Sequence, residues 1–108
     1  RAAAHEDINL ITLIPAASDG GLEVLDSKGQ WHAVEHEDGD IVVNVADMLQ
    51  MLTNHEYLST THRVQNPKDL TRDRVSMPMF IHPDPDYDLG PMTAHEYLEK
   101  RLGEIGLK

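Results

Sequence analysis

The sequence predicts a mainly β protein, a sandwich or barrel of antiparallel strands followed by one C-terminal α-helix. Short runs of apolar and β-branched residues alternate with turn residues along most of the chain, which is typical of antiparallel all-β domains. One longer segment near the C-terminus has apolar residues at helical spacing instead, behind a helix-start signal. The 108 residues leave room for a single domain with one core.

Four strands are expected in the first half of the chain. Residues 8–14 are mostly apolar and β-branched and should form a strand that is buried on at least one face. The segments 22–25 and 30–34 flank a loop at 26–29 whose residues suit a hairpin, with glycine in a left-handed conformation. Residues 40–45 are rich in Val and Ile and should form the fourth strand.

The second half is expected to hold a short helix and two more strands. Helix-forming residues fill 47–52, and β-forming residues fill 57–65 and 75–81. Pro78 lies inside the last segment, and because proline cannot donate to a strand ladder, it predicts an edge strand or a bulge. Residues 82–91 contain three prolines and three aspartates and should cross the surface without regular structure.

The C-terminal helix should begin at Thr93. Thr93 and Glu96, three residues later, have the spacing of a capping box. Apolar side chains then recur at helical spacing and are most simply a packing stripe: Tyr97, Leu98, Leu102 and Ile105. Gly106 suits the end of the helix.

Composition excludes several classes of function. Nine Lys and Arg against 19 Asp and Glu give a net charge of −10, so nucleic acid and anionic lipid are poor partners. The lack of cysteine excludes disulfides, thiolate zinc sites and a cysteine nucleophile. We find no signal peptide and no long apolar run, and expect a cytoplasmic protein that does not enter a membrane. Seven histidines leave metal chemistry with nitrogen and oxygen ligands open.

The tripeptide His-x-Asp occurs three times, so its position must decide which copy carries chemistry. The copies at 36–38 and 82–84 lie in a polar turn and in the proline-rich stretch, where solvated loop charges are the simpler explanation. His5 and Asp7 immediately precede a strand that is expected to be buried. Residues two apart in extended structure project to the same side, so both should point inward. A buried carboxylate beside an imidazole then needs a partner.

A metal ion with a third protein ligand would be such a partner. His62 is the candidate, because it lies in a dense run of β-forming residues. Two histidines and one carboxylate on one face of an octahedron are the ligand set of non-haem Fe(II) oxygenases. Three positions then stay open, enough for a bidentate co-substrate and dioxygen.

A candidate anion site follows His62 in the sequence. Arg74 and Ser76 should share one face of the last strand, and a guanidinium with a hydroxyl suits a carboxylate. Arg74 could also simply pair with Asp7, Asp69 or Asp73.

Taken in order, these segments resemble the catalytic half of the isopenicillin N synthase-like family of Fe(II) and 2-oxoglutarate-dependent oxygenases. Six ordered motifs carry the resemblance over essentially the whole chain: 5–14, 20–24, 43–54, 59–64, 74–76 and 93–107. The sequence departs from the family pattern at Asn9 and Ala46, where glycine is usual, and at Glu23, where glutamine is usual. We expect Asn9 to be tolerated because Asn can adopt a left-handed conformation.

The resemblance implies a double-stranded β-helix (jelly roll) in which His5, Asp7 and His62 hold Fe(II). It implies that 2-oxoglutarate chelates the iron and that its far carboxylate meets Arg74 and Ser76. The implied reaction oxidises a C–H bond of a small-molecule substrate with dioxygen, in the manner of a hydroxylation, and releases succinate and CO2.

The resemblance also implies that the chain is a fragment, because family members are considerably longer. Residues 1–84 would be the C-terminal part of the jelly-roll core, and 85–108 the surface wrap and helix. The missing N-terminal half would hold the first strands and much of the substrate pocket. An incomplete jelly roll exposes strand edges and apolar surface, so the isolated chain is expected to be inactive and to self-associate or need its other half.

Two alternatives stay open from the sequence. One is an oxidase of the same family that uses Fe(II) without 2-oxoglutarate, since such enzymes keep the Arg-x-Ser motif. The other is a non-catalytic metal-binding jelly-roll module, since zinc shares these ligand types. The substrate is not specified, because fold analogy does not supply it.

Overall fold

A computed structural model describes residues 2–15, 21–37, 39–65 and 77–106. Within these ranges the chain forms seven strands and two helices. In chain order they are β1 (Ala2–His5), β2 (Ile11–Pro15), β3 (Leu22–Leu25), β4 (Trp31–Ala33), β5 (Ile41–Val45), α1 (Asp47–Leu52), β6 (His62–Val64), β7 (Met79–Ile81) and α2 (Ala94–Glu104).

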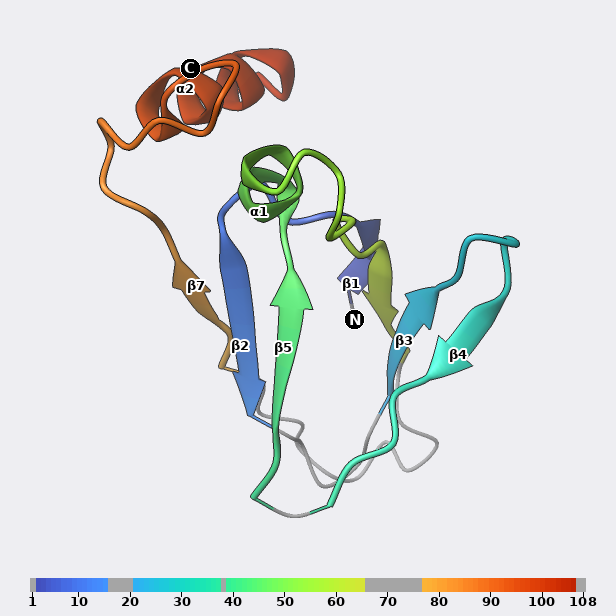
Figure 1. The fold of residues 1–108 in the computed structure, drawn as a ribbon. Coiled ribbons are helices and arrows are strands. Elements are labelled where there is room, and N and C mark those ends of the chain that lie inside the picture. Colours follow the sequence, from blue (N-terminus) through green and yellow to red (C-terminus); the bar gives the residue numbers. More distant parts are fainter. Residues whose placement is uncertain (1, 16–20, 38, 66–76, 107–108) are drawn as a thin grey trace.

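The strands form two antiparallel sheets. One has the order β1-β6-β3-β4 and the other the order β5-β2-β7. Figure 1 shows the two sheets as separate layers, with α1 and the β1–β2 connection at one end and α2 beyond that end. The predicted fold class, mainly antiparallel β structure with a C-terminal helix, is confirmed.

The three-stranded sheet has β2 in the middle. Leu13 of β2 pairs with Val43 of β5 on one side and with Met79 of β7 on the other. In the described structure β7 has β2 as its only strand partner. It is therefore an edge strand, as Pro78, which lies directly before it, predicted.

Two departures from the prediction occur around the first motif. Residues 2–5, which carry no clear strand signal, form β1 because they pair with β6. The strand predicted over 8–14 starts only at Ile11. Before it, the chain bends where the start of α1 donates two backbone hydrogen bonds, from Asp47 N to Asp7 O (2.9 Å) and from Met48 N to Asn9 O (3.0 Å).

The strand predicted over 57–65 is also shorter than expected and covers only His62–Val64. After α1 the chain turns through Asn54 and His55, whose φ values of 52° and 68° lie in the left-handed region. Residues 57–61 therefore lie outside the strand although their local β propensity is high.

The expected C-terminal helix is confirmed together with its cap. Thr93 Oγ1 accepts the backbone N–H of Glu96 (3.2 Å), and the Glu96 carboxylate accepts the N–H of Thr93 (3.0 Å). Both donors at the start of α2 are thus satisfied by the predicted capping box. No helix in the described ranges is long and apolar enough to cross a bilayer.

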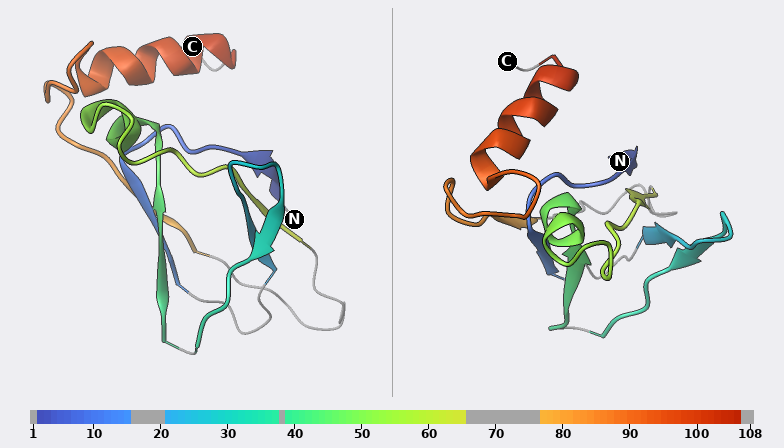
Figure 2. Two further views of the ribbon diagram at one scale, coloured as in Figure 1. Left: turned by 45° about the vertical axis from the view of Figure 1, so that its right-hand side comes forward. Right: turned by 45° about the horizontal axis from the view of Figure 1, so that its top comes forward.

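The apolar core lies at the helical end of the molecule. Buried side chains of α1, α2 and the connection from β7 to α2 pack together: Met48, Leu89, Ala94 and Tyr97. Figure 2 shows both helices at this end from two further directions. A second group of buried residues is polar, namely Asp7, Asn9, Thr12, Asn44, Asp47 and His62. Burying a polar side chain costs free energy unless it is hydrogen-bonded, so the partners of these six residues must be identified.

Candidate metal centre

Strand pairing brings two histidines side by side. His5 at the end of β1 is the register partner of His62 at the start of β6. Their ring centroids lie 4.3 Å apart, with the ring planes inclined by 55°. His62 is buried, whereas the side chain of His5 is 46% exposed. The expectation that His5 points into the interior is therefore only partly correct, because β1 leaves one side of the ring open.

Backbone carbonyls set which nitrogen of each ring faces the site. His5 Nδ1 lies 2.7 Å from Ala3 O, and His62 Nδ1 lies 3.0 Å from Thr60 O. A carbonyl oxygen can only accept, so each Nδ1 carries the proton and donates it. In the neutral imidazole, Nε2 then presents a lone pair, which is the form that ligates metal ions.

Asp7 completes the group from the bend after β1. Its Oδ1 lies 3.2 Å from His5 Nε2 and 3.8 Å from His62 Nε2. Its Oδ2 accepts a hydrogen bond of 2.6 Å from Thr12 Oγ1. The side chain is 7% exposed, so the carboxylate is held largely out of water.

The three residues offer ligand atoms that all lie within 4.8 Å of one another. Two neutral imidazole nitrogens and one carboxylate oxygen fit a divalent ion such as Fe(II), and the ion would balance the buried negative charge. Within the described residues this is the one such group of three. Neither His36 nor His82 belongs to it; Asp38 lies outside the described residues.

A cavity of about 560 Å³ opens beside the cluster, a size typical of small-molecule sites. His5 and Asp7 line it together with residues of the β1–β2 connection, of β7 and α2, and of the positions directly after these two elements: Glu6, Ile8, Asn9, Phe80, His82, Arg101 and Ile105. Because part of this lining is apolar, the cavity can accept an organic molecule next to the metal ligands.

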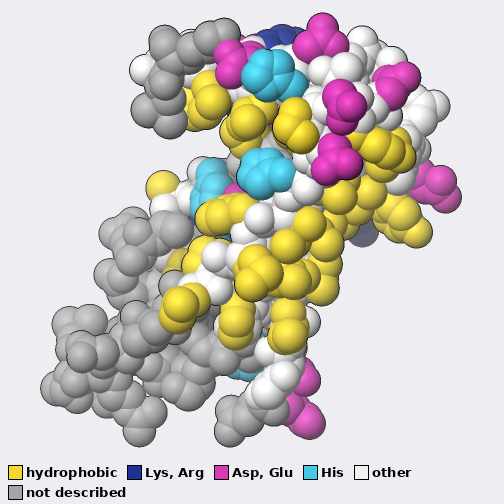
Figure 3. All heavy atoms as spheres, turned by 90° about the vertical axis from the view of Figure 1, so that its left-hand side faces the viewer, with side chains coloured by type: hydrophobic (Ala, Val, Ile, Leu, Met, Phe, Trp, Pro, Cys, Tyr) yellow, Lys and Arg dark blue, Asp and Glu magenta, His cyan; other side chains and the backbone are white. Residues whose placement is uncertain are grey.

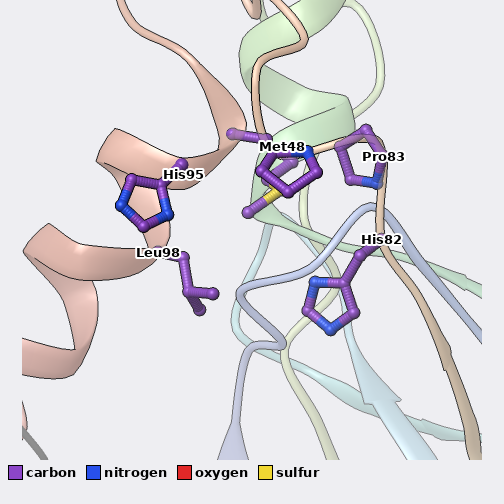
Figure 4. Close-up of a pocket in the computed structure, with 7 residues that line it drawn as sticks. Met48, His82, Pro83, His95 and Leu98 are labelled. Atoms are coloured by element: carbon purple, nitrogen blue, oxygen red, sulfur yellow. The ribbon is translucent and has the colours of Figure 1, made fainter.

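A second hollow of about 240 Å³ adjoins the helical core. Figure 4 shows His82 and His95 on opposite sides of it, with Met48 and Leu98 between them. Because His82 lines both hollows, this residue marks the boundary between the cavity at the metal ligands and the space under α2.

A buried polar contact ties α2 to α1 near the site. Tyr97 Oη donates to Asp47 Oδ2 at 2.8 Å, and Arg101 Nη1 donates to the same oxygen at 3.2 Å. Burial, together with the hydrogen bond to Asp47 and its charge, raises the pKa of Tyr97 to about 12. Tyr97 is thus more than the packing residue predicted. The sequence did contain a signal for this polar contact, because Arg101 follows Tyr97 by four residues and therefore lies on the same face of the helix.

Arg74 and Ser76 lie outside the described residues. Asn9, expected to adopt a left-handed conformation, is not among the residues with positive φ. It is accommodated because its side chain bonds to Thr12 and to backbone carbonyls.

Comparison with known proteins bears on this arrangement. The family model described as the 2OG-Fe(II) oxygenase superfamily matches residues 1–83. The chain belongs to the 2OG-Fe(II) oxygenase superfamily. A curated superfamily relative, the 2-oxoglutarate-Fe(II) type oxidoreductase ppzC of Metarhizium majus, is 41% identical over 103 residues, which are 95% of this chain and 25% of the relative.

Solved structures of superfamily relatives share the fold. A Shewanella oneidensis protein for which oxygenase activity has been suggested is 47% identical, with a TM-score of 0.92, over all of this chain and 41% of that one. A full-length Neurospora crassa protein in complex with alpha-KG is 28% identical, with a TM-score of 0.82, over 97% of this chain and 37% of that one. The chain thus spans about a quarter of the curated relative and about two fifths of these solved chains.

Proposed function

We propose that the chain is the C-terminal catalytic part of a non-haem Fe(II), 2-oxoglutarate-dependent oxygenase that hydroxylates or similarly oxidises a small molecule. The convergence of His5 Nε2, His62 Nε2 and Asp7 Oδ1 carries the proposal. Superfamily membership supports it, as do a relative named as a 2-oxoglutarate-Fe(II) type oxidoreductase and a structural relative in complex with alpha-KG.

His5, Asp7 and His62 are the proposed iron ligands. When bound, Fe(II) would supply the oxidation of a substrate C–H bond by dioxygen, coupled to conversion of 2-oxoglutarate to succinate and CO2. The chain's own part is orientation. The carbonyls of Ala3 and Thr60 fix the two imidazoles, and the lining of the 560 Å³ cavity shapes the space for substrate.

Arg74 and Ser76 are proposed to hold the far carboxylate of 2-oxoglutarate. Charge-assisted contacts of this kind contribute about 1.5–3 kcal/mol, so Arg74→Ala should weaken 2-oxoglutarate binding roughly ten- to a hundredfold. Arg74→Lys keeps the charge without the planar fork of the guanidinium, and its 2-oxoglutarate affinity should lie between those of the wild type and Arg74→Ala. Unchanged 2-oxoglutarate affinity in Arg74→Ala, measured by calorimetry on the Mn(II)-loaded protein, would remove this role.

The alternatives predicted from the sequence are less well supported than 2-oxoglutarate dependence. The relatives include a named 2-oxoglutarate-Fe(II) oxidoreductase, which favours a 2-oxoglutarate-dependent enzyme over an oxidase or a non-catalytic module. Counting succinate formed per dioxygen consumed tests the point, since an oxidase would form none.

An upstream part of a longer domain is proposed to complete the active enzyme. The face of the β5-β2-β7 sheet that carries Ile41, Val43 and Met79 is apolar, and each of these side chains is more than half exposed. Figure 3 shows hydrophobic side chains gathered on the side of the molecule that includes β7. Exposed apolar side chains gathered on one face are typical of a protein–protein contact surface. We propose residues 1–84 as part of the catalytic core, 85–108 as its wrap and helix, and self-association when the upstream half is missing.

Metal binding is the direct test of the proposed site. His62→Ala should reduce Mn(II) or anaerobic Fe(II) binding by more than the roughly 10- to 100-fold that an outer partner contributes. His36→Ala, which changes a histidine outside the cluster, is the matched control and should leave metal content unchanged. Equal loss of metal from both variants would reject the ligand assignment.

A further inference from the structure

The two oxygens of Asp7 have different surroundings. Oδ1 faces both imidazoles, at 3.2 Å from His5 Nε2 and 3.8 Å from His62 Nε2. Oδ2 accepts the 2.6 Å hydrogen bond from Thr12 Oγ1. One oxygen is therefore directed at the ligand cluster while the other is bonded to β2.

The hydroxyl of Thr12 has little freedom to point elsewhere. Thr12 is 1% exposed, so water does not compete for it. Asn9 Nδ2 donates to Thr12 Oγ1 at 3.2 Å, which leaves the hydroxyl hydrogen for Asp7. The reverse bond, from Thr12 to Asn9 Oδ1, is long at 3.5 Å.

Backbone carbonyls fix the orientation of the Asn9 amide in turn. Its Nδ2 lies 2.6 Å from Ile11 O and 3.3 Å from Ile81 O. Carbonyl oxygens need a donor, so the nitrogen and not the oxygen of the amide must face them. The amide nitrogen has two hydrogens for three acceptors, Ile11 O, Ile81 O and Thr12 Oγ1, so one hydrogen is shared between two of them. Thr12 thus faces a donor on Asn9, and its own hydrogen goes to Asp7.

Strand register places Thr12 on the face of the sheet that looks toward the site. Thr12 of β2 pairs with Asn44 of β5 and Phe80 of β7, so the three side chains share one face. Phe80 lines the cavity beside His5 and Asp7. The residue in the middle of this row is a threonine whose hydroxyl meets the carboxylate.

The arrangement bears on how many oxygens Asp7 can give to a metal ion. A carboxylate can bind an ion through one oxygen or through both. With three ligand atoms from the chain, three octahedral positions remain for an oxo acid and dioxygen. A second oxygen from Asp7 would take one of these positions.

We propose that Thr12 is a positioning residue that keeps Asp7 monodentate, with Asn9 fixing the direction of the Thr12 hydroxyl. The proposal rests on the metal site proposed above and adds a reason why a polar side chain is buried at this place in β2. It predicts that loss of the hydroxyl acts on 2-oxoglutarate binding, because the freed oxygen competes for the position that the oxo acid needs.

The test compares Thr12→Val, which keeps the shape without the hydroxyl, with Thr12→Ser, which keeps the hydroxyl. Thr61→Val is the matched control, since the Thr61 hydroxyl bonds to Glu6 at 2.9 Å and not to Asp7. With Co(II) as the metal probe, 2-oxoglutarate affinity in Thr12→Val should fall roughly tenfold or more. Thr12→Ser should restore it and Thr61→Val should leave it unchanged. The Co(II) absorption bands should change in Thr12→Val and stay unchanged in Thr61→Val. A purely structural defect would not change these bands in Thr12→Val alone.

A measurement on the unmodified protein keeps the proposal open to refutation if Thr12→Val does not fold. Infrared difference spectra on adding Co(II), with Asp carboxylates labelled by carbon-13, should show the wide separation of carboxylate stretches expected for binding through one oxygen. A narrow, bidentate separation would overturn the proposal, as would wild-type 2-oxoglutarate affinity in Thr12→Val. Co(II) binding that does not depend on His62 would instead reject the metal site itself.

Discussion

Replacing Tyr97 with Phe removes a single hydroxyl from the buried contact between α1 and α2. Tyr97 is 8% exposed and its partner Asp47 is 7% exposed. The Tyr97 hydroxyl donates to Asp47 Oδ2 at 2.8 Å and itself accepts from Arg101 Nη1 at 3.3 Å. The change therefore withdraws one of the two side-chain donors to a buried carboxylate oxygen and leaves the ring in place.

The structure sets the expected magnitude for Tyr97→Phe. A hydrogen bond to a charged group contributes about 1.5–3 kcal/mol to the free energy of unfolding. Arg101 remains on the same carboxylate oxygen at 3.2 Å, so we expect a loss of about 1.5–2 kcal/mol, in the lower part of that range. In a domain of this size the thermal midpoint should fall by roughly 6–16 °C.

The same substitution should remove a dependence of stability on alkaline pH. An unfolded tyrosine has its ordinary pKa of 10.0, whereas the pKa of Tyr97 in the folded protein is about 12. Between these values the unfolded chain loses the proton and the folded protein keeps it. The stabilisation is therefore complete below pH 10 and is lost as the pH rises through 12. A shift of this size corresponds to a change of at most about 3 kcal/mol.

Urea unfolding at pH 7 and at several values between pH 9.5 and 12, followed by circular dichroism, measures both effects. Tyr87→Phe is the control, because Tyr87 is 48% exposed and its loss of a hydroxyl should change stability by less than about 0.5 kcal/mol. Wild-type stability of Tyr97→Phe at pH 7 would refute this reasoning. So would a variant that keeps the wild-type loss of stability above pH 10.

A left-handed residue, a helix cap and a metal ligand give three more tests. His55→Gly should raise the free energy of unfolding by up to about 1 kcal/mol. At φ of 68° a residue with a side chain is strained, and relief of this strain should exceed the entropy that a glycine loses on folding. His55→Ala keeps the strain and should show no such gain in urea unfolding. Thr93→Ala should cost about 1 kcal/mol by removing the cap of α2, while Thr93→Ser should cost much less, which thermal melts of the two variants would show. Mn(II) should raise the thermal midpoint in a concentration-dependent manner and should do so far less in His62→Ala; equal shifts in both proteins would place the ion elsewhere.

Local signals in the sequence determined several parts of this protein. Apolar and β-branched runs bounded by turn residues predicted the strands at 22–25 and 40–45, and they predicted antiparallel architecture. The capping box at Thr93 predicted where α2 starts, since both of its hydrogen bonds lie within four consecutive residues. Each of these features depends on neighbours in the chain, which a sequence displays directly.

Tertiary structure decided the features that depend on residues far apart in the chain. β1 has no strong strand signal and forms by pairing with β6, and that register places His5 against His62 from a distant part of the sequence. The sequence singled out His5, Asp7 and His62 although His-x-Asp occurs three times, but only the fold shows that their ligand atoms lie within 4.8 Å of one another. The hydrogen bond from Tyr97 to Asp47 likewise joins residues that are 50 positions apart in the sequence. A side chain's propensity reports its own backbone, whereas the partner that satisfies a buried polar group is supplied by whichever distant segment packs against it.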